Sequence, residues 1–168
     1  YLNSPESDIF EKGKMLFAFE KASSNIRKKD KAIIVEGYFD VISLHSKGIT
    51  NSVASLGTAL NKYQISQLCR CTDNKNIILN FDSDNAGILA TKRVIKEVES
   101  LSLHDQINLK ILQLSDFKDP DEYLNSHTPE DYFNLIDNSS FWIDWEIDQI
   151  FKDKDLTKSE IFQSVISS

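Results

Sequence analysis

The chain has 168 residues, of which 40% are hydrophobic and 27% are charged, with a formal net charge of -7 and a pI of about 4.9. This length and composition suit one substantial domain with a sizeable core and do not indicate intrinsic disorder. The acidic balance argues against binding of nucleic acid by the whole surface, although it leaves room for a local basic strip. A polyanionic substrate would therefore need bound cations or a focused basic patch.

Simple signals of a zinc site or a membrane span are missing from the sequence. Cys69 and Cys71 form a single C-x-C without a nearby histidine, which favours free thiols in a reducing cytosol over a zinc site. No apolar run approaches the ~18 residues of a membrane span, and no signal peptide is visible. We therefore expect a cytoplasmic protein without a membrane partner. Because the chain begins at Tyr1 rather than at Met, we also expect an excised piece.

Over the first 120 residues, the sequence patterns predict strands and helices that alternate along the chain. A continuous apolar run at 32–35 is typical of a strand that is buried on both faces, and "NIILNF" at 76–81 is a second such run. The order predicts a parallel sheet with right-handed crossovers, flanked by helices, which is an α/β fold. The predicted elements are a loop at 1–10, a helix at 11–29, a strand at 32–35, a helix at 38–46, a strand within 51–60 that turns at Gly57, a helix at 61–71, a strand at 76–81, a helix at 85–99 and a strand at 107–114.

After Pro120 the pattern predicts helices only, and these form a small C-terminal helical subdomain. A boundary near His127 divides the chain into a preceding loop and helix at 1–30, the α/β domain at 31–127 and the helical subdomain at 128–168. The predicted helices lie within 120–126, 129–138, 140–151 and 158–167.

Carboxylates follow the predicted strands at the points where the strands end. Glu36 comes directly after 32–35, and the pair Asp82 and Asp84 comes after 76–81. The carboxyl ends of parallel strands meet at one edge of a sheet, where functional groups collect. Residues two apart on an extended chain point to the same side, about 6.5 Å apart, so this pair could bind one divalent ion or bridge two. Oxygen ligands suit Mg²⁺ or Mn²⁺ rather than zinc.

Each carboxylate also has a structural explanation. Asp40 lies in the first turn of a predicted helix, where a negative charge is favourable. Asp119 in "DPDE" is typical of a helix N-cap, and Asp82 and Asp84 suit a strand-end turn and another N-cap. Glu36 is harder to explain in this way, because it follows "AIIV" directly and lacks an obvious solvated face. The shared placement of these residues favours a function over separate structural roles.

Four segments together resemble a known family. "VEGYFDVI", "VASLGTAL", "FDSDNAG" and "DPDEYL", in this order and at these separations, are similar to the Toprim core of bacterial DnaG-type primases. The opening "YLNSPESDIFEKGKMLF" resembles the segment that precedes this core in the RNA polymerase domain of the family. The glutamate and the D-x-D pair alone would indicate only Toprim domains in general. "YLNSPE" and "SLGTAL" narrow the resemblance to primases, over about residues 1–126.

The resemblance implies synthesis of short RNA primers on single-stranded DNA from ribonucleoside triphosphates, by the nucleotidyltransferase chemistry of a DNA-directed RNA polymerase. It implies Mg²⁺ or Mn²⁺ as cofactor, in a site that holds two ions. The residues that it marks as catalytic are Glu36, Asp82 and Asp84; those that it marks as metal-binding are Glu36, Asp40, Asp82, Asp84, Asp119 and Asp121; and those that it places near nucleotide or template are Asn3, Lys12 and Gly57. Glu36 could be a metal ligand or a proton acceptor.

Whole primases of this type also have a zinc-binding domain, a basic lobe and a helicase-interaction domain. We expect this chain to be a catalytic-centre fragment that is weakly active or inactive alone, with zinc and the replicative helicase bound by the other domains. Three alternatives remain open at this stage. They are a Toprim nuclease, a metal-binding or nucleic-acid-binding module that is inactive without the other lobes, and an aspartyl-phosphate phosphatase or receiver domain.

Overall fold

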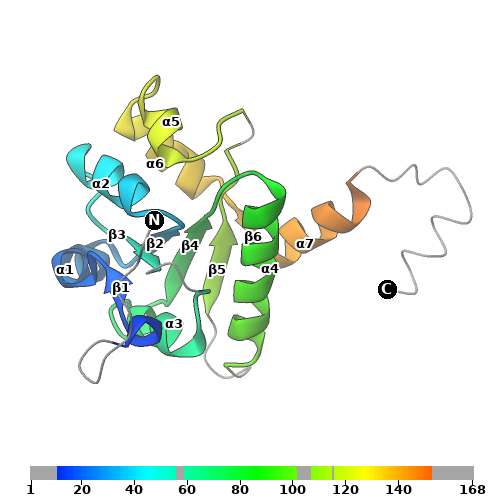
Figure 1. Ribbon diagram of the computed structural model, residues 1–168, viewed down its shortest axis with the longest axis horizontal. Helices are drawn as coiled ribbons and strands as arrows, with labels where there is room; N and C mark the ends of the chain where they lie inside the picture. The colour runs from blue at the N-terminus through cyan, green and yellow to red at the C-terminus, as the bar shows by residue number, and fades with distance from the viewer. Residues whose placement is uncertain (1–10, 56–58, 102–106, 115, 153–168) are drawn as a thin grey trace, which may run out of the picture.

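The computed structural model describes residues 11–55, 59–101, 107–114 and 116–152. Six strands of this part of the chain form one mixed sheet in the order β1-β3-β2-β4-β5-β6 (Figure 1). The four inner strands are parallel to one another, and the two edge strands pair antiparallel with their neighbours. The strands are β1 (Leu16–Phe17), β2 (Ala32–Val35), β3 (Ser52–Ser55), β4 (Asn76–Asn80), β5 (Asn108–Ile111) and β6 (Ser140–Phe141).

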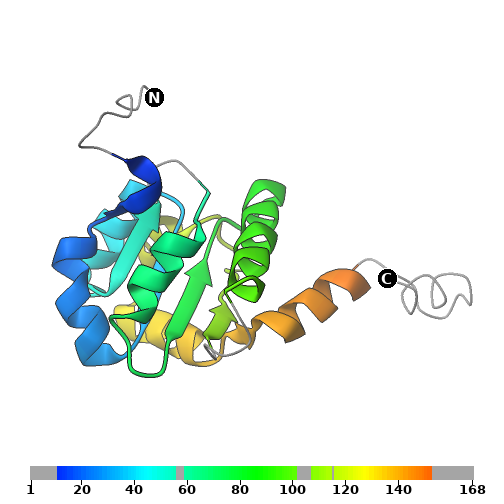
Figure 2. The ribbon, with the colours of Figure 1, turned by 90° about the horizontal axis from the view of Figure 1, so that it is seen from below.

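Helices cover both faces of this sheet and bury its apolar side chains. The helices are the 3-10 turn η1 (Lys12–Lys14), α1 (Phe19–Lys29), α2 (Tyr38–Ser46), α3 (Lys62–Cys69), α4 (Asn85–Glu99), α5 (Pro120–Leu124), α6 (Pro129–Asp137) and α7 (Trp142–Phe151). Helices α2, α5 and α6 pack against one face, and α1, α3 and α4 pack against the other (Figures 1 and 2). Along β2, Ile33 faces the first layer and Ile34 the second, as expected of a strand buried on both sides. None of the described helices is long and apolar enough to cross a membrane.

The prediction of a sheet flanked by helices is confirmed, but the prediction of a helix over 11–29 is wrong at its start. Residues 12–14 form the 3-10 turn, Leu16 and Phe17 form edge strand β1, and Ala18 has a left-handed backbone with φ of 62° before α1 begins. The apolar residues at 15, 17 and 19 are two apart, which is a strand period rather than a helix period. This short alternation is consistent with the pairing of Leu16 and Phe17 with β3.

The prediction of helices only after Pro120 is also wrong at one point. Ser140 and Phe141 form β6, which pairs with Ile111 and Lys110 of β5. A strand of two residues is too short to show alternation in the sequence. The proposed boundary near His127 stays a prediction, and the helix expected at 158–167 lies outside the described residues.

Tyr132 connects α6 to the centre of the sheet. It is fully buried, and its hydroxyl donates a hydrogen bond to Asn80 Oδ1 at 2.7 Å. The amide of Asn80 in turn donates to the carbonyl of Leu112 at 3.2 Å. Burial raises the pKa of Tyr132, so the hydroxyl keeps its proton and acts as the donor. This polar chain joins α6, β4 and the residue after β5 just behind the carboxyl edge of the sheet.

We predict that Tyr132→Phe lowers the free energy of unfolding by about 1–3 kcal/mol, because Asn80 Oδ1 is then left without a donor. Urea unfolding monitored by circular dichroism measures this change. Tyr63→Phe is the matched control, since Tyr63 is 50% exposed, and its effect should stay within about 0.5 kcal/mol. Equal effects of the two substitutions would contradict a structural role for the buried hydrogen bond.

Candidate metal centre

The sheet register brings the first two predicted site segments together. In the parallel pair of β2 and β4, Val35 lies opposite Asn80. Glu36 therefore leaves β2 beside the point where Phe81 and Asp82 leave β4. This is the carboxyl edge of the parallel strands, where the loops from both strands can contribute side chains to one site.

The turn "FDSDNAG" holds Asp82 and Asp84 in defined positions. Asp84 caps α4, since its Oδ1 accepts a hydrogen bond from the Gly87 N–H at 2.9 Å. Gly87 lies so close to the main chain of Asp82 that a Cβ atom at position 87 would overlap the Asp82 carbonyl. Only glycine permits this approach without movement of the backbone. The N-cap role predicted for Asp84 is confirmed.

Ser83 ties this turn to the loop that leads into α5. Its N–H donates to the Lys118 carbonyl at 3.2 Å, and its hydroxyl donates to the Leu114 carbonyl at 2.9 Å. Asp119 comes directly after Lys118 and caps α5, because its Oδ1 accepts a hydrogen bond from the Glu122 N–H at 2.9 Å. Asp119 is thus the N-cap that the sequence predicts, and it also belongs to a loop that is attached to Asp82 and Asp84.

Asp40 lies in the first turn of α2 and is 7% exposed. Its Oδ2 accepts a hydrogen bond from the Gly37 N–H at 3.0 Å. Burial raises the pKa of Asp40 to about 6, and this hydrogen bond opposes the rise. The negative charges of Asp119, Asp82 and Asp121 also raise the pKa of Asp40. Asp40 therefore shares an electrostatic environment with carboxylates from both neighbouring loops.

Glu36 is in a similar electrostatic environment, directly after β2 and four residues before Asp40. Burial is the main cause that raises the pKa of Glu36, and the charges of Asp82, Asp84 and Asp40 add to it, while the Asp82 N–H lowers it. The Oε1 atom of Glu36 is buried, and no described residue donates a hydrogen bond to it. A buried carboxylate oxygen without a donor is costly, and it leaves an acceptor available at this edge.

Asp82 has the one cationic contact that the structure records among the predicted carboxylates. Burial raises the pKa of Asp82, and Asp119 and Asp84 raise it further, whereas Lys118 lowers it. The Lys118 Nζ atom lies 3.8 Å from Asp82 Oδ2, and the lysine is largely exposed. Lys118 is not among the residues that the sequence patterns indicate, although its place directly before Asp119 marks it as a neighbour of the site.

Six predicted carboxylates, from three loops and the first turns of the helices that follow them, thus affect one another electrostatically. They are Glu36, Asp40, Asp82, Asp84, Asp119 and Asp121. No three histidine, cysteine, aspartate or glutamate side chains among the described residues are arranged closely enough to hold a metal ion together. The donor set, made of carboxylate oxygens with one unpaired Glu36 atom, nevertheless fits the hard ions Mg²⁺ and Mn²⁺ in its chemistry. Metal binding by these residues stays a prediction.

The other three predicted site residues are not placed by the structure. Asn3 and Gly57 lie outside the described residues. Lys12 begins the 3-10 turn η1, and only its main chain is described. Their proximity to nucleotide or template stays a prediction.

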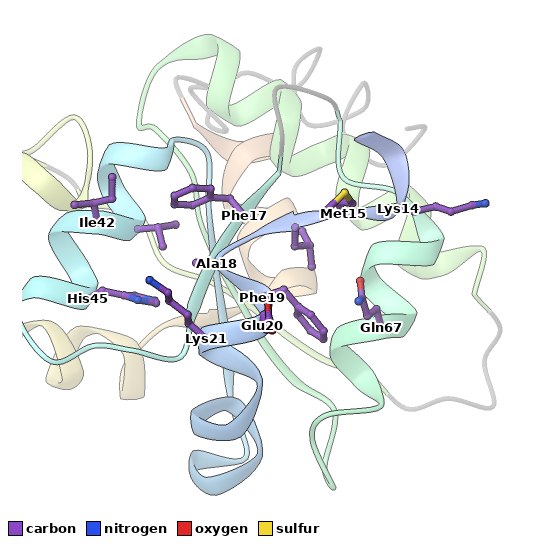
Figure 3. A pocket seen from close by; sticks show the side chains of 12 residues that line it. Lys14, Met15, Phe17, Ala18, Phe19, Glu20, Lys21, Ile42, His45 and Gln67 are labelled. Atoms are coloured by element: carbon purple, nitrogen blue, oxygen red, sulfur yellow. The ribbon is translucent and has the colours of Figure 1, made fainter. Parts of the chain in front are cut away.

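A sizeable groove lies in a different part of the molecule from the six carboxylates. A groove of about 610 Å³ lies over edge strand β1, where side chains of β1, α2 and α3 surround it (Figure 3). Met15, Phe17 and Ile42 give it an apolar lining, and Glu20 is the one acidic side chain among the described residues that line it. His45 of this groove is already bonded, with Nε2 at 3.0 Å from the Ser52 carbonyl. The groove lacks the carboxylate chemistry of the strand ends.

The raised pKa of Asp40 generates a prediction about stability. Because the folded-state pKa of about 6 exceeds the ordinary value of 3.8, the folded protein binds this proton more tightly, and stability falls as pH rises through this window. Asp40→Asn removes this cost but keeps an acceptor for Gly37. In EDTA at pH 7 the variant should be more stable than the parent by up to about 3 kcal/mol, and the gain should vanish below about pH 4.

Urea unfolding at both pH values measures this difference. Asp148→Asn on the exposed surface of α7 is the matched control, and it should change stability by less than about 0.5 kcal/mol at either pH. A destabilised Asp40→Asn variant at pH 7 would show that the carboxylate is stabilising where it lies.

Comparison with curated proteins finds DNA primases along the whole chain. The chain is 49% identical to the DNA primase of Synechococcus elongatus over 168 residues, which is 100% of this chain and 24% of the relative. It is 47% identical to the DNA primase of Synechocystis sp. over 167 residues, 98% of this chain and 26% of the relative. The chain therefore spans about a quarter of the length of these curated relatives.

Solved structures of primase catalytic domains share this fold. The E. coli primase catalytic core matches with a TM-score of 0.82 and 31% identity, over 95% of this chain and 50% of that one. A DnaG primase catalytic domain bound to single-stranded DNA matches with a TM-score of 0.83 and 29% identity, over 99% and 53%. The zinc-binding and RNA polymerase domains of Aquifex aeolicus primase match with a TM-score of 0.76 and 34% identity, over 99% and 40%.

A family model described as Toprim-like matches residues 33–124, which is more than half of the chain. These residues run from β2 to the end of α5 and carry all six carboxylates of the edge. The Toprim resemblance that the sequence motifs indicate is confirmed. The chain belongs to the Toprim-like family.

Proposed function

We propose that this chain is the carboxylate-bearing part of a DNA primase catalytic core, which joins ribonucleotides into short RNA primers on single-stranded DNA during replication. The observation that carries the proposal is the gathering of six carboxylates at one sheet edge, in a chain that matches primase catalytic cores along its length. The cytoplasm is the proposed place of action.

The proposed site assigns different tasks to the carboxylates. Asp82, Asp84, Asp119 and Asp121 hold Mg²⁺ or Mn²⁺, and Asp40 adds negative charge from α2. Glu36 is a further ligand or the acceptor of the proton from the attacking hydroxyl. When bound, a pair of divalent ions neutralises charge on the reacting phosphates and lowers the pKa of that hydroxyl.

Lys118 and the helix caps support this arrangement. Lys118 offsets part of the charge of Asp82 through its contact at 3.8 Å. The caps at Asp84 and Asp119 use one carboxylate oxygen each, Oδ1 in both residues, for the helix N–H groups. The second oxygen of each side chain is left for a cation.

The template and the other primase partners belong to different parts of the proposed whole protein. A chain with a net charge of -7 has little means to neutralise a row of template phosphates, which is the main source of single-strand affinity. The match to a catalytic domain that was solved with single-stranded DNA supports such a template for the whole core. Zinc and the replicative helicase are proposed to bind domains outside this chain.

Primer synthesis tests the proposed chemistry. This chain alone should make little or no primer from ribonucleotides and Mg²⁺, because template binding is missing. In a complete catalytic core that carries these 168 residues, Asp84→Asn should reduce incorporation of labelled ribonucleotides about 10²-fold or more. Asparagine also caps helices well, so the loss should occur without unfolding of α4.

Asp148→Asn in the same core is the control and should retain full activity. An Asp84→Asn core with undiminished synthesis would overturn the proposed role of the carboxylate edge. Metal-dependent cleavage of DNA without ribonucleotide incorporation would instead identify a Toprim nuclease.

The position of the ion gives a second and independent test. In crystals soaked in Mn²⁺, we predict anomalous density among the side chains of Asp82, Asp84, Asp119 and Asp121, since the charges of these carboxylates affect one another or Asp40. The peak should disappear in Asp84→Asn crystals soaked in the same way. Density confined to any other part of the chain would show that the metal site is assigned wrongly.

A further inference from the structure

Helix α7 (Trp142–Phe151) has two apolar sides, and the described part of the chain covers only one of them. Trp145 on the inner side is 3% exposed and lies in the core layer of α1, α3 and α4, against which Trp142 also packs. The helix extends away from the sheet towards its C-terminal end (Figures 1 and 2). Four apolar side chains on its other side are between 38% and 53% exposed, namely Ile143, Ile147, Ile150 and Phe151.

These four side chains form one continuous stripe, which we call the outer face of α7. With about 3.6 residues per turn, they lie within an arc of about 100°, and Ile147 lies about 160° from Trp145. Asp144 and Asp148 border the stripe on one side, and Glu146 borders it on the other. Single exposed apolar residues are common, whereas a stripe at positions i, i+4 and i+7 is typical of a helix that packs against a partner. The outer face therefore indicates a helical partner.

The next segment of the sequence predicts such a partner. In "LTKSEIFQSVIS" at 156–167, Thr157 and Glu160 have the spacing of a capping box, and Leu156 and Ile161 have the spacing of a hydrophobic staple. These signals predict a helix that begins at Lys158. Its polar residues alternate with apolar ones that recur at helical spacing, and the apolar ones are Ile161, Phe162, Val165 and Ile166. A short amphipathic helix of this kind needs an apolar surface to pack against.

The connection between the two helices is short. Helix α7 ends at residue 151 and the predicted helix begins at residue 158, so residues 152–157 join them. Connections of about 2–8 residues usually place two helices antiparallel and side by side. In such a hairpin, Ile147 would lie opposite Phe162, and Ile143 would lie opposite Ile166. The two apolar stripes thus match in length and in order.

We propose that residues 158–167 form a helix that docks antiparallel on the outer face of α7. A second copy of the chain is a weaker candidate for this face, because it must lose the freedom of a whole molecule on binding, whereas a tethered segment is always close by. The inference does not depend on the proposed function. The docked helix would also steady β6, which directly precedes α7 and pairs with β5.

Hydrogen exchange of the 168-residue chain, followed by mass spectrometry, tests the docking. A helix shorter than about 12–15 residues is marginal in water on its own. We therefore expect amides of 158–167 to exchange about tenfold or more slowly in the chain than in a free peptide of the same sequence. Ile147→Glu places a charge on the outer face and should return these amides to the exchange rate of the peptide.

Leu89→Glu is the matched control for Ile147→Glu. Leu89 is 55% exposed on α4, so the same kind of change is made on another helix, and the slow exchange of 158–167 should persist. Two results would overturn the proposal. One is exchange of 158–167 in the parent chain at the rate of the free peptide, and the other is slow exchange that Ile147→Glu leaves unchanged.

The reciprocal substitution keeps the test valid if Ile147→Glu unfolds α7 itself. Phe162→Glu should speed exchange of the amides at 146–151 by about tenfold, while the amides of β2 and β4 stay protected. Gln163→Glu, on the polar side of the predicted helix, should leave exchange at 146–151 unchanged. Equal effects of these two substitutions would contradict docking through the apolar side. Slow exchange that requires high protein concentration, with a dimer in light scattering, would assign the outer face to a second copy instead.

Discussion

The crowding of carboxylates at the carboxyl edge of the sheet is the constraint that shapes this structure. Burial raises the pKa of Glu36, Asp40 and Asp82, and each of the three is also affected by neighbouring negative charges. Such an arrangement is unfavourable for an isolated domain at neutral pH, since ionising each group costs more in the folded chain than in the unfolded one. Lys118 at 3.8 Å from Asp82 offsets only part of this cost, because it is largely exposed. The fold must therefore hold these groups by contacts other than ion pairs.

In the turn "FDSDNAG", hydrogen bonds and close contacts with the main chain hold the carboxylates in place. Gly87 touches the Asp82 backbone, Asp84 caps α4, and Ser83 hydrogen-bonds the carbonyls of Leu114 and Lys118. Asp84 thus has a structural role and is also a candidate site residue. For Asp84 and Asp119, the N-cap explanation and the functional explanation are compatible, because a carboxylate has a second oxygen after it has capped a helix. A cap made in this way orients the side chain before any ion arrives, which reduces the reorganisation that binding requires.

The parts of the fold that could be predicted from the sequence are those encoded by local patterns. Continuous apolar runs mark β2 and β4, helical periodicity and a cap mark α4, and their order places Glu36 and Asp82 at one edge. The edge strands β1 and β6 have two residues each, too few for a period, and depend on partners far along the chain. The Tyr132 bond to Asn80 spans 52 residues and has no local signal. Lys118 was missed because a lone lysine in a loop is usually a solvated charge.

Acidity at the proposed metal edge and affinity for a template would place opposite demands on one surface. Divalent ions need several carboxylates, whereas template phosphates need cations, and opposite charges within about a Debye length of 8–10 Å would neutralise each other. With its net charge of -7, the chain would meet only the first demand. The basic residues that the proposed activity requires must then lie at a distance from Asp82 and Asp84, yet near enough for the reacting end of a primer to reach them. Under the proposed function, a separate lobe facing the carboxyl edge would satisfy both conditions, with the carboxylates and the template contacts in different segments of the polypeptide.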